Sequence, residues 1–208
     1  MKIIDRIMKT CLICMNEHEI LIVRVHESTV FKGITVEYDA VYEYCDDYNE
    51  FNSTEEMISL NDIAVKNAYR KAVGLLTSDE IKAIRSKYGI SQFDLSTLLG
   101  WGAKTITRYE GHQVQDFAHD TILRKIDSDP QWFLILLETN KNKFLEATYQ
   151  KYFSTALKLF GESYDLYRQI AVKARRAWFK SNKGYSGMKR KCARFRIIGQ
   201  RPLNKQQI

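Results

Sequence analysis

The stretch from residue 89 to residue 111 constrains this chain more than any other part of its sequence. It reads GISQFDLSTLLGWGAKTITRYEG, a pattern that predicts two short amphipathic helices joined by a glycine-bounded turn. We expect the hydroxyl of Ser91 to cap the first helix and Gly100 to end it. Gly102 then lets the chain turn before a second helix from about Ala103 to Tyr109. This order of elements is typical of a helix-turn-helix, whose second helix can enter a major groove.

The two helices are predicted to bury one stripe and to expose another. The residues predicted to lie largely on the buried stripe are Phe93, Leu95, Leu98 and Leu99, with Ile106 turned inward from the second helix. The residues predicted to contact DNA are Gln92, Lys104, Thr105, Thr107 and Arg108. The alternative for so short a stretch is an ordinary helical hairpin with a solvated polar face.

The flanking sequence favours the first interpretation. The preceding helix carries apolar residues at three- and four-residue steps after a cap at Thr77 or Ser78. The following helix carries Phe117, Ile122 and Ile126 before Pro130 stops it. Four or five helices in this interval, with the pattern S-Q-x-x-L-x-x-L-L-G followed by T-R-Y-E-G, resemble the Cro and lambda-repressor class of DNA-binding domains.

The amino-terminal region predicts a small sheet that carries cysteines. The segments EILIVRV and TVFKGITVEYDAVYEY alternate apolar and polar residues as β-strands do, with Gly33 near a turn. Cys11 and Cys14 have the spacing of a metal-binding turn, and Cys45 follows 31 positions later. Such thiolates can bind zinc, and the metal can stabilise a small sheet that lacks a large core.

A complete four-cysteine site would need one more thiolate, and Tyr48 stands where it is expected. We therefore predict any zinc at Cys11, Cys14 and Cys45, with the fourth ligand missing. The residues that could complete the site are His18, His26, Asp46 and Asp47, with water as a further choice. The alternative is that the three cysteines are reduced thiols packed in a decayed zinc ribbon.

Charge is segregated along the chain. Residues 1–70 hold 7 Lys or Arg against 13 Asp or Glu, whereas residues 171–208 hold 12 against none. The net charge of +7 therefore originates in the carboxy-terminal end, where Cys192 is expected to be a free thiol. Such a basic tail is expected to bind phosphates or an acidic partner, or else to lie against the acidic residues of segment 1–70 of the same chain.

Several classes of protein are disfavoured. The chain has no run of 18 apolar residues and no signal-peptide pattern in its first ten residues, so we expect a cytoplasmic protein. It has no Gly-rich phosphate loop and no H-E-x-x-H, and its histidines show no triad spacing. We do not expect an enzyme.

From Lys141 to Lys180 the chain predicts helix, with aromatic residues at mostly helical steps and a break in the pattern at Gly161. An aromatic stripe of this kind is more often a core or a dimer seam than a ligand site. The function of this third of the chain does not follow from its pattern.

The cysteines, the segment NDIAVKNAYRKAVG and the helix-turn-helix stretch, in this order, resemble the MqsA, or YgiT-type, zinc-finger/helix-turn-helix antitoxins. The resemblance runs from about Met8 to Thr139. It implies a structural zinc, a cognate toxin bound by the amino-terminal domain, and a homodimer that binds a palindromic operator in double-stranded DNA and represses its own operon. The family's recognition-helix arginine matches Arg108, and its base-reading asparagine matches Lys104, a change that favours guanine over adenine.

We therefore expect an α+β fold in five parts. They are a β-rich zinc-ribbon-like domain over 8–60, a helical linker over 61–76, a lambda-repressor-like helix-turn-helix domain over 77–140, a helical extension over 141–180 and a basic tail over 181–208. The expected function is that of a DNA-binding antitoxin of a type II toxin-antitoxin system. The alternative is a stand-alone transcriptional repressor of a phage or mobile element, without a toxin.

Overall fold

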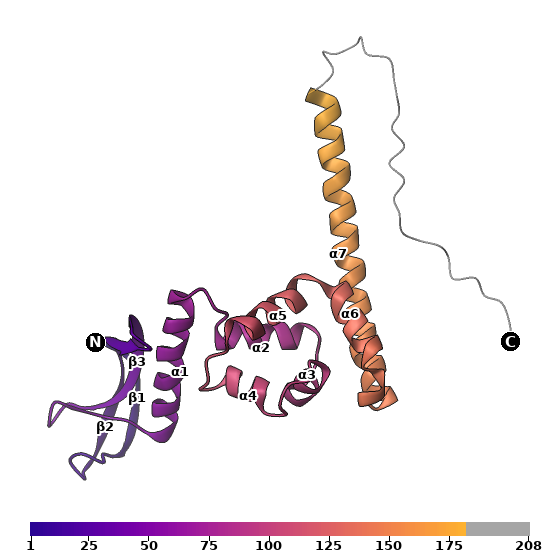
Figure 1. Ribbon diagram of the computed structural model, residues 1–208. Coiled ribbons are helices and arrows are strands. Elements are labelled where there is room, and N and C mark those ends of the chain that lie inside the picture. Colours follow the sequence, from indigo (N-terminus) through magenta and orange to yellow (C-terminus); the bar gives the residue numbers. More distant parts are fainter. Residues whose placement is uncertain (182–208) are drawn as a thin grey trace, which may run out of the picture. The chain divides into compact units, whose positions relative to one another are not determined.

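The computed structural model describes residues 1–181, and its fold is α+β, with an antiparallel sheet followed by helices (Figure 1). Met1–Tyr164 forms one compact unit, and a second begins at Asp165. The predictions made for the basic tail and for Cys192 lie outside the described residues. None of the described helices combines the length and apolar character that a membrane-spanning helix needs.

The sheet has four strands in the order β1-β2-β3-β4, and every neighbouring pair is antiparallel. The strands are β1 (Lys2–Thr10), β2 (Glu17–Phe31), β3 (Ile34–Cys45) and β4 (Glu50–Asn52). Lys32 and Gly33 connect β2 to β3 with φ of 48° and 79°. Two successive positive φ angles match the twist of a two-residue hairpin, so the predicted turn at Gly33 is confirmed.

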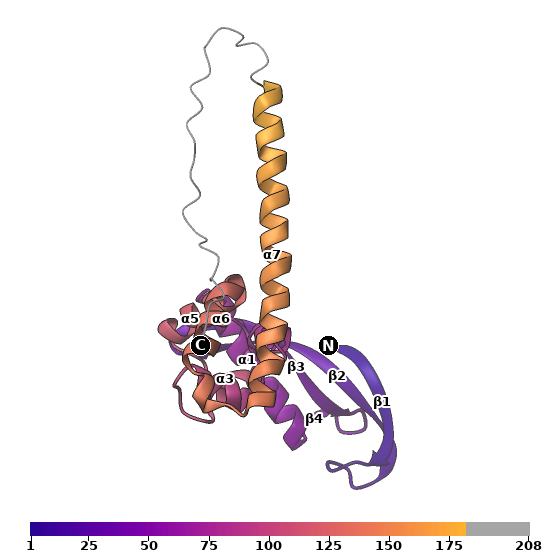
Figure 2. The same cartoon turned by 90° about the vertical axis from the view of Figure 1, so that its right-hand side faces the viewer.

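Helix α1 (Glu55–Ala72) lies beside the sheet in both views and packs mainly against β3 (Figures 1 and 2). Thr54 caps its first turn by accepting a hydrogen bond from the N–H of Met57. The Asn61 side chain bonds to both backbone groups of Val41, at 2.8 Å to N and 3.0 Å to O. The helix thus covers part of the free edge of β3, and it differs from the linker expected over 61–76 because it begins earlier and packs on the sheet.

Five helices follow. They are α2 (Ser78–Lys87), α3 (Gln92–Leu98), α4 (Thr105–Glu110), α5 (Phe117–Ser128) and α6 (Pro130–Thr139). Thr77 and Glu80 form a capping box at the start of α2, which decides between the two caps that the sequence offered. Gly100, with φ of +70°, ends α3 in the left-handed conformation that glycine adopts most easily.

A single apolar core joins these helices. It includes Ile81, Leu95, Ile106 and Leu123, all with no exposed side-chain surface, and a stacked pair formed by Tyr88 and Phe133. Phe93 was predicted to lie on the buried stripe, and this is wrong, because its side chain is 60% exposed. The apolar residues of α3 that are buried are Leu95 and Leu98, and Leu99 packs against the same core.

The last helix begins inside this core. A short 3-10 turn, η1 (Lys141–Lys143), leads into α7 (Glu146–Ser181), whose 36 residues run through Gly161 without interruption. The break predicted at Gly161 is therefore wrong, since a glycine within a helix costs only about 1 kcal/mol. Tyr149, Tyr152 and Ala156 are buried with α2–α6, so the start of the expected extension is part of the helical domain.

Candidate metal centre and candidate nucleic-acid interface

Four side chains converge at one end of the sheet. Cys11 and Cys14 lie in the turn between β1 and β2, His18 lies near the start of β2, and Cys45 ends β3. The three sulfur atoms and one ring nitrogen all lie within 4.8 Å of one another. These four residues could hold a metal ion, and within residues 1–181 they form the one cluster of this kind.

The turn between β1 and β2 directs the first two thiols inward. The N–H of Cys11 donates to the carbonyl of Asn16 at 2.8 Å, and its carbonyl accepts from the N–H of Met15 at 3.0 Å. Met15 has φ of 60°, which closes the loop tightly. The N–H of Ile13 points at the Cys11 sulfur at 3.4 Å, and such a donor stabilises a thiolate.

His18 is oriented for coordination through Nε2. Its Nδ1 lies 3.0 Å from the backbone carbonyl oxygen of Glu19, so Nδ1 carries the proton in the tautomer that satisfies this contact. In this tautomer Nε2 carries no proton, and it lies 3.7 Å from the Cys45 sulfur. A tetrahedral zinc with ordinary Zn–S and Zn–N bonds separates these atoms by roughly 3.6 Å. A histidine held by a backbone carbonyl is a common arrangement in zinc sites.

The electrostatics of the cluster suit a cation. A hydrogen bond from the backbone of Cys14 lowers the pKa of Cys11 to about 6. A hydrogen bond to Cys11 raises the pKa of His18, whereas burial raises the pKa of Cys45. Zinc binds thiolates and neutral imidazole. A bound zinc ion would therefore displace the protons that His18 and Cys45 retain, and it would compensate the negative charge of the thiolates.

The prediction that the site lacks a fourth ligand, because Tyr48 stands where a cysteine is expected, needs correction. Tyr48 is 61% exposed and is not part of the cluster, and neither are His26, Asp46 and Asp47. Of the residues that could complete the site, His18 is the one that the structure brings to it. Its signal in the sequence was the spacing C-x-x-C-x-x-x-H, in which the histidine lies near the start of the strand that follows the turn.

A second set of candidate residues lies on α3 and α4. Lys104, Thr107 and Arg108 are exposed, Thr105 and Gln92 are partly buried, and Ile106 is fully buried as predicted. Among residues 1–181, neither Lys104 nor Arg108 forms an ion pair. Two cations on one short helix therefore remain available to an external anion.

Gln92, which is predicted to contact DNA, forms two side-chain hydrogen bonds within the protein. Its amide nitrogen donates to Glu110 at 2.7 Å, and its amide oxygen accepts from the Thr107 hydroxyl at 3.0 Å. Glu110 also pairs with Arg85 at 2.7 Å. Gln92 thus joins α3 to α4 and helps to fix the orientation of α4, and one amide hydrogen remains for another acceptor.

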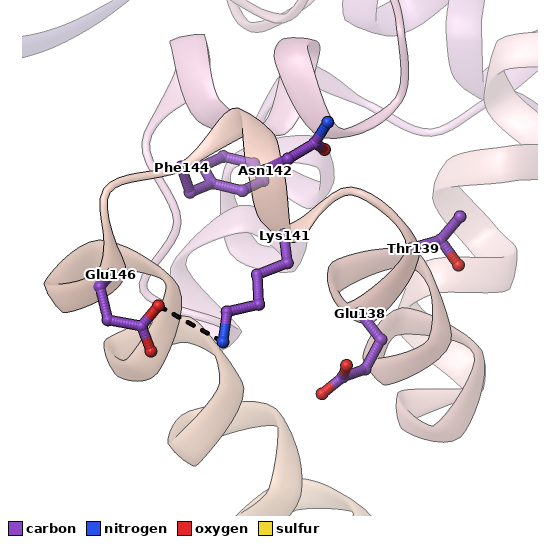
Figure 3. A pocket seen from close by; sticks show the side chains of 6 residues that line it. All are labelled: Glu138, Thr139, Lys141, Asn142, Phe144 and Glu146. Carbon is purple, nitrogen blue, oxygen red and sulfur yellow. Dashed lines mark ion pairs between the residues drawn. The ribbon is translucent and has the colours of Figure 1, made fainter.

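A surface pocket of about 530 Å³ lies between the end of α6 and the start of α7 (Figure 3). Glu138, Lys141 and Glu146 point toward it. Lys141 pairs with Glu146 at 3.4 Å, and the hydroxyl of Tyr149 donates to Glu138. The charged groups at this pocket are thus already partnered within the protein.

The chain is thus an α+β protein whose amino-terminal sheet carries a cluster of three cysteines and one histidine that could hold a metal ion. No protein-family model matches this chain, and no curated protein matches its sequence.

Proposed function

We propose that this chain is a sequence-specific DNA-binding protein that reads duplex DNA through α4. The observation that carries the proposal is the pair of exposed cations, Lys104 at the N-cap of α4 and Arg108 within it, neither of which forms an ion pair with residues 1–181, on a helix whose inner face holds the buried Ile106. Arginine and lysine on such a helix can donate hydrogen bonds to guanine O6 and N7 in the major groove. The α2–α6 domain then acts as a lambda-repressor-like helix-turn-helix domain.

Within this proposal, Arg108 and Lys104 contact base edges, whereas Thr105 and Thr107 contact phosphates. Thr105 is the first residue of α4, and Thr107 lies one half-turn further along the same helix. Gln92 orients Thr107 and keeps one amide hydrogen for a phosphate. The protein binds as a homodimer on a palindromic operator. The two copies of α4 would then enter successive major grooves about one helical turn apart, as in other helix-turn-helix dimers.

The resemblance to the MqsA, or YgiT-type, antitoxins supports the second part of the proposal. The chain neutralises a cognate toxin through its amino-terminal sheet and represses its own operon. Zinc is the metal we assign to Cys11, Cys14, His18 and Cys45, because thiolate and imidazole ligands suit it in a tetrahedral site. The metal stabilises the end of a sheet whose strand β1 contributes little buried surface.

The DNA-binding proposal can be tested by selecting sequences from a randomised pool of 30-base-pair duplexes with the purified full chain. We expect enrichment of an inverted repeat with guanines in each half-site. Specific binding about a thousandfold tighter than binding to random duplex is typical of such proteins. Failure to enrich any sequence would contradict the proposal.

The antitoxin and the stand-alone repressor differ in their partners. Coexpression of the tagged chain with the neighbouring open reading frame should recover a complex of comparable stoichiometry and suppress any toxicity of that product. A repressor without a toxin would enrich an operator equally well, but it would purify without a stoichiometric partner. The second result would favour the repressor and leave the DNA-binding proposal intact.

A further inference from the structure

Arg70, near the end of α1, is a charged residue with no exposed surface. Its guanidinium forms no ion pair with any residue that the structure describes up to residue 181. Burial lowers the pKa of Arg70, an effect opposed by the charges of Asp120 and Asp79, and arginine still keeps its charge. A buried cation of this kind needs hydrogen-bond acceptors, and three of its four acceptors lie outside α1.

Two of the acceptors are backbone carbonyls, one in the last turn of α4 and one in the loop that follows it. Nη2 donates to the carbonyl of Tyr109 at 2.7 Å and to that of Gln113 at 2.8 Å. Nη1 donates to Asn67 on α1 at 2.8 Å, and Nε donates to the Gln115 side chain at 3.0 Å. Arg70 therefore adds a donor from α1 to the last turn of α4, whose carbonyls otherwise accept, among the residues described, only from the backbone N–H groups of the residues that follow.

Helix α4 depends on such support. It has only six residues, and Lys104 at its amino-terminal end provides no side-chain cap. A helix of this length is unstable by itself and forms only through tertiary contacts. The positive guanidinium also lies where the partial negative charge of the helix end is concentrated.

The same helix that carries Arg70 also holds the sheet. Asn61 bonds to both backbone groups of Val41 on β3, the strand that ends in Cys45. The ring of Tyr69 packs edge-on against Phe31, at 5.2 Å between ring centroids. One continuous helix therefore contacts both the strand that carries a metal ligand and the end of α4.

We propose that Arg70 is a positioning residue for α4: it fixes the carboxy-terminal end of this helix from α1 and thereby sets the orientation of Lys104 and Arg108. The consequence of this role of Arg70 for DNA recognition rests on the proposed function. The effect of Arg70 on the order of α4 does not depend on that function.

The test compares amide hydrogen exchange in the full-length wild type with two variants, Arg70→Lys and Arg124→Lys. Lysine keeps the charge of Arg70 but cannot bond to both carbonyls in the same planar geometry. Arg124 is the control because it is an arginine that also donates to a backbone carbonyl of another element: it bonds to Asp120 within α5 and to the carbonyl of Gly74 in the loop after α1, but not to α4.

We expect the amides of Gly111 and Gln113, which bond to carbonyls within α4, to exchange about tenfold or more faster in Arg70→Lys. The amides of α5 should change much less, and Arg124→Lys should not accelerate α4. An equal acceleration of every helix in the domain would show a loss of global stability only and would overturn the positioning role. No acceleration of α4 would overturn it as well.

Two further measurements complete the test. If Arg70→Lys does not fold, the wild-type guanidinium should still show separate Nη resonances by NMR, because bonds to fixed acceptors hinder its rotation; a single averaged signal would contradict the inference. If it folds, its preference for selected over random duplex should fall about tenfold, with random binding unchanged. A wild type that binds no DNA would refute the proposed function and leave the exchange experiment decisive.

Discussion

His18 Nδ1 lies 3.0 Å from the carbonyl oxygen of its neighbour Glu19, and this contact turns Nε2 toward the three cysteines. We predict that the wild type binds about one zinc per chain and that His18→Ala lowers the affinity about tenfold or more, since one of four ligands is lost. Competition with a chromophoric chelator measures this. Tyr48→Ala is the control, because Tyr48 is outside the cluster; equal zinc affinities for both variants would refute the role of His18.

The second prediction concerns the amino-terminal part of α7. Tyr152 is buried, and its hydroxyl donates to Asp94 on α3 at 2.6 Å. Tyr152→Ala should destabilise the protein by about 3–5 kcal/mol, whereas Tyr164→Ala, at a position that is 61% exposed, should cost less than about 0.5 kcal/mol. Urea unfolding measures both. Similar midpoints would show that α7 does not belong to the helical core.

The third prediction concerns the ion pair between Arg85 and Glu110, whose carboxylate side chain is only 3% exposed. Glu110→Ala leaves the guanidinium partly buried without its partner and removes the acceptor of Gln92, so we expect a loss of about 3–5 kcal/mol. Glu162→Ala breaks an exposed pair with Lys158 and should change stability by less than about 0.5 kcal/mol. Equal effects would contradict the structural role of Glu110.

The fourth prediction is a dependence of stability on pH. Burial raises the pKa of Asp120, but hydrogen bonds from the N–H of Leu76, from Gln115 and from Arg124 outweigh burial and hold this pKa below its usual value. A carboxyl whose pKa falls on folding stabilises the native state above its unfolded pKa of about 4. That stabilisation is lost as the pH falls through the folded pKa.

We therefore expect the free energy of unfolding to decrease as the pH falls below about 4, and Asp120→Asn to show a shallower decrease. Urea unfolding at several pH values checks this, with Asp165→Asn as an exposed control. Parallel curves for the wild type and Asp120→Asn would show that Asp120 is not the group responsible.

The sequence predicts the strands and the paired helices because each carries local signals. The alternation in β2 and β3, the residues that favour a turn at Gly33, and the caps at Ser91 and Thr77 all act over a few positions. They need no knowledge of distant contacts, and the structure has the corresponding elements.

The remaining features depend on tertiary contacts that local patterns do not encode. Phe93 occurs at a helical spacing, but α3 packs with Leu95 and Leu98 toward the core and leaves Phe93 exposed. His18 was one of several possible ligands until the pairing of β1 with β2 placed it beside Cys11. Arg70 is a single basic residue in an amphipathic helix, and nothing near it in the sequence indicates that its partners lie about 40 residues away.

We propose that α4 reads DNA bases, and the decisive measurement is the affinity of Arg108→Ala for a selected duplex and for a scrambled duplex at one salt concentration. We predict that binding to the selected duplex weakens about tenfold or more, because a base-reading contact is worth about 1–3 kcal/mol, while binding to the scrambled duplex changes little. Arg24→Ala, which removes an exposed arginine from the sheet, should leave both affinities unchanged. An equal loss of affinity for both duplexes in Arg108→Ala would contradict base reading by α4.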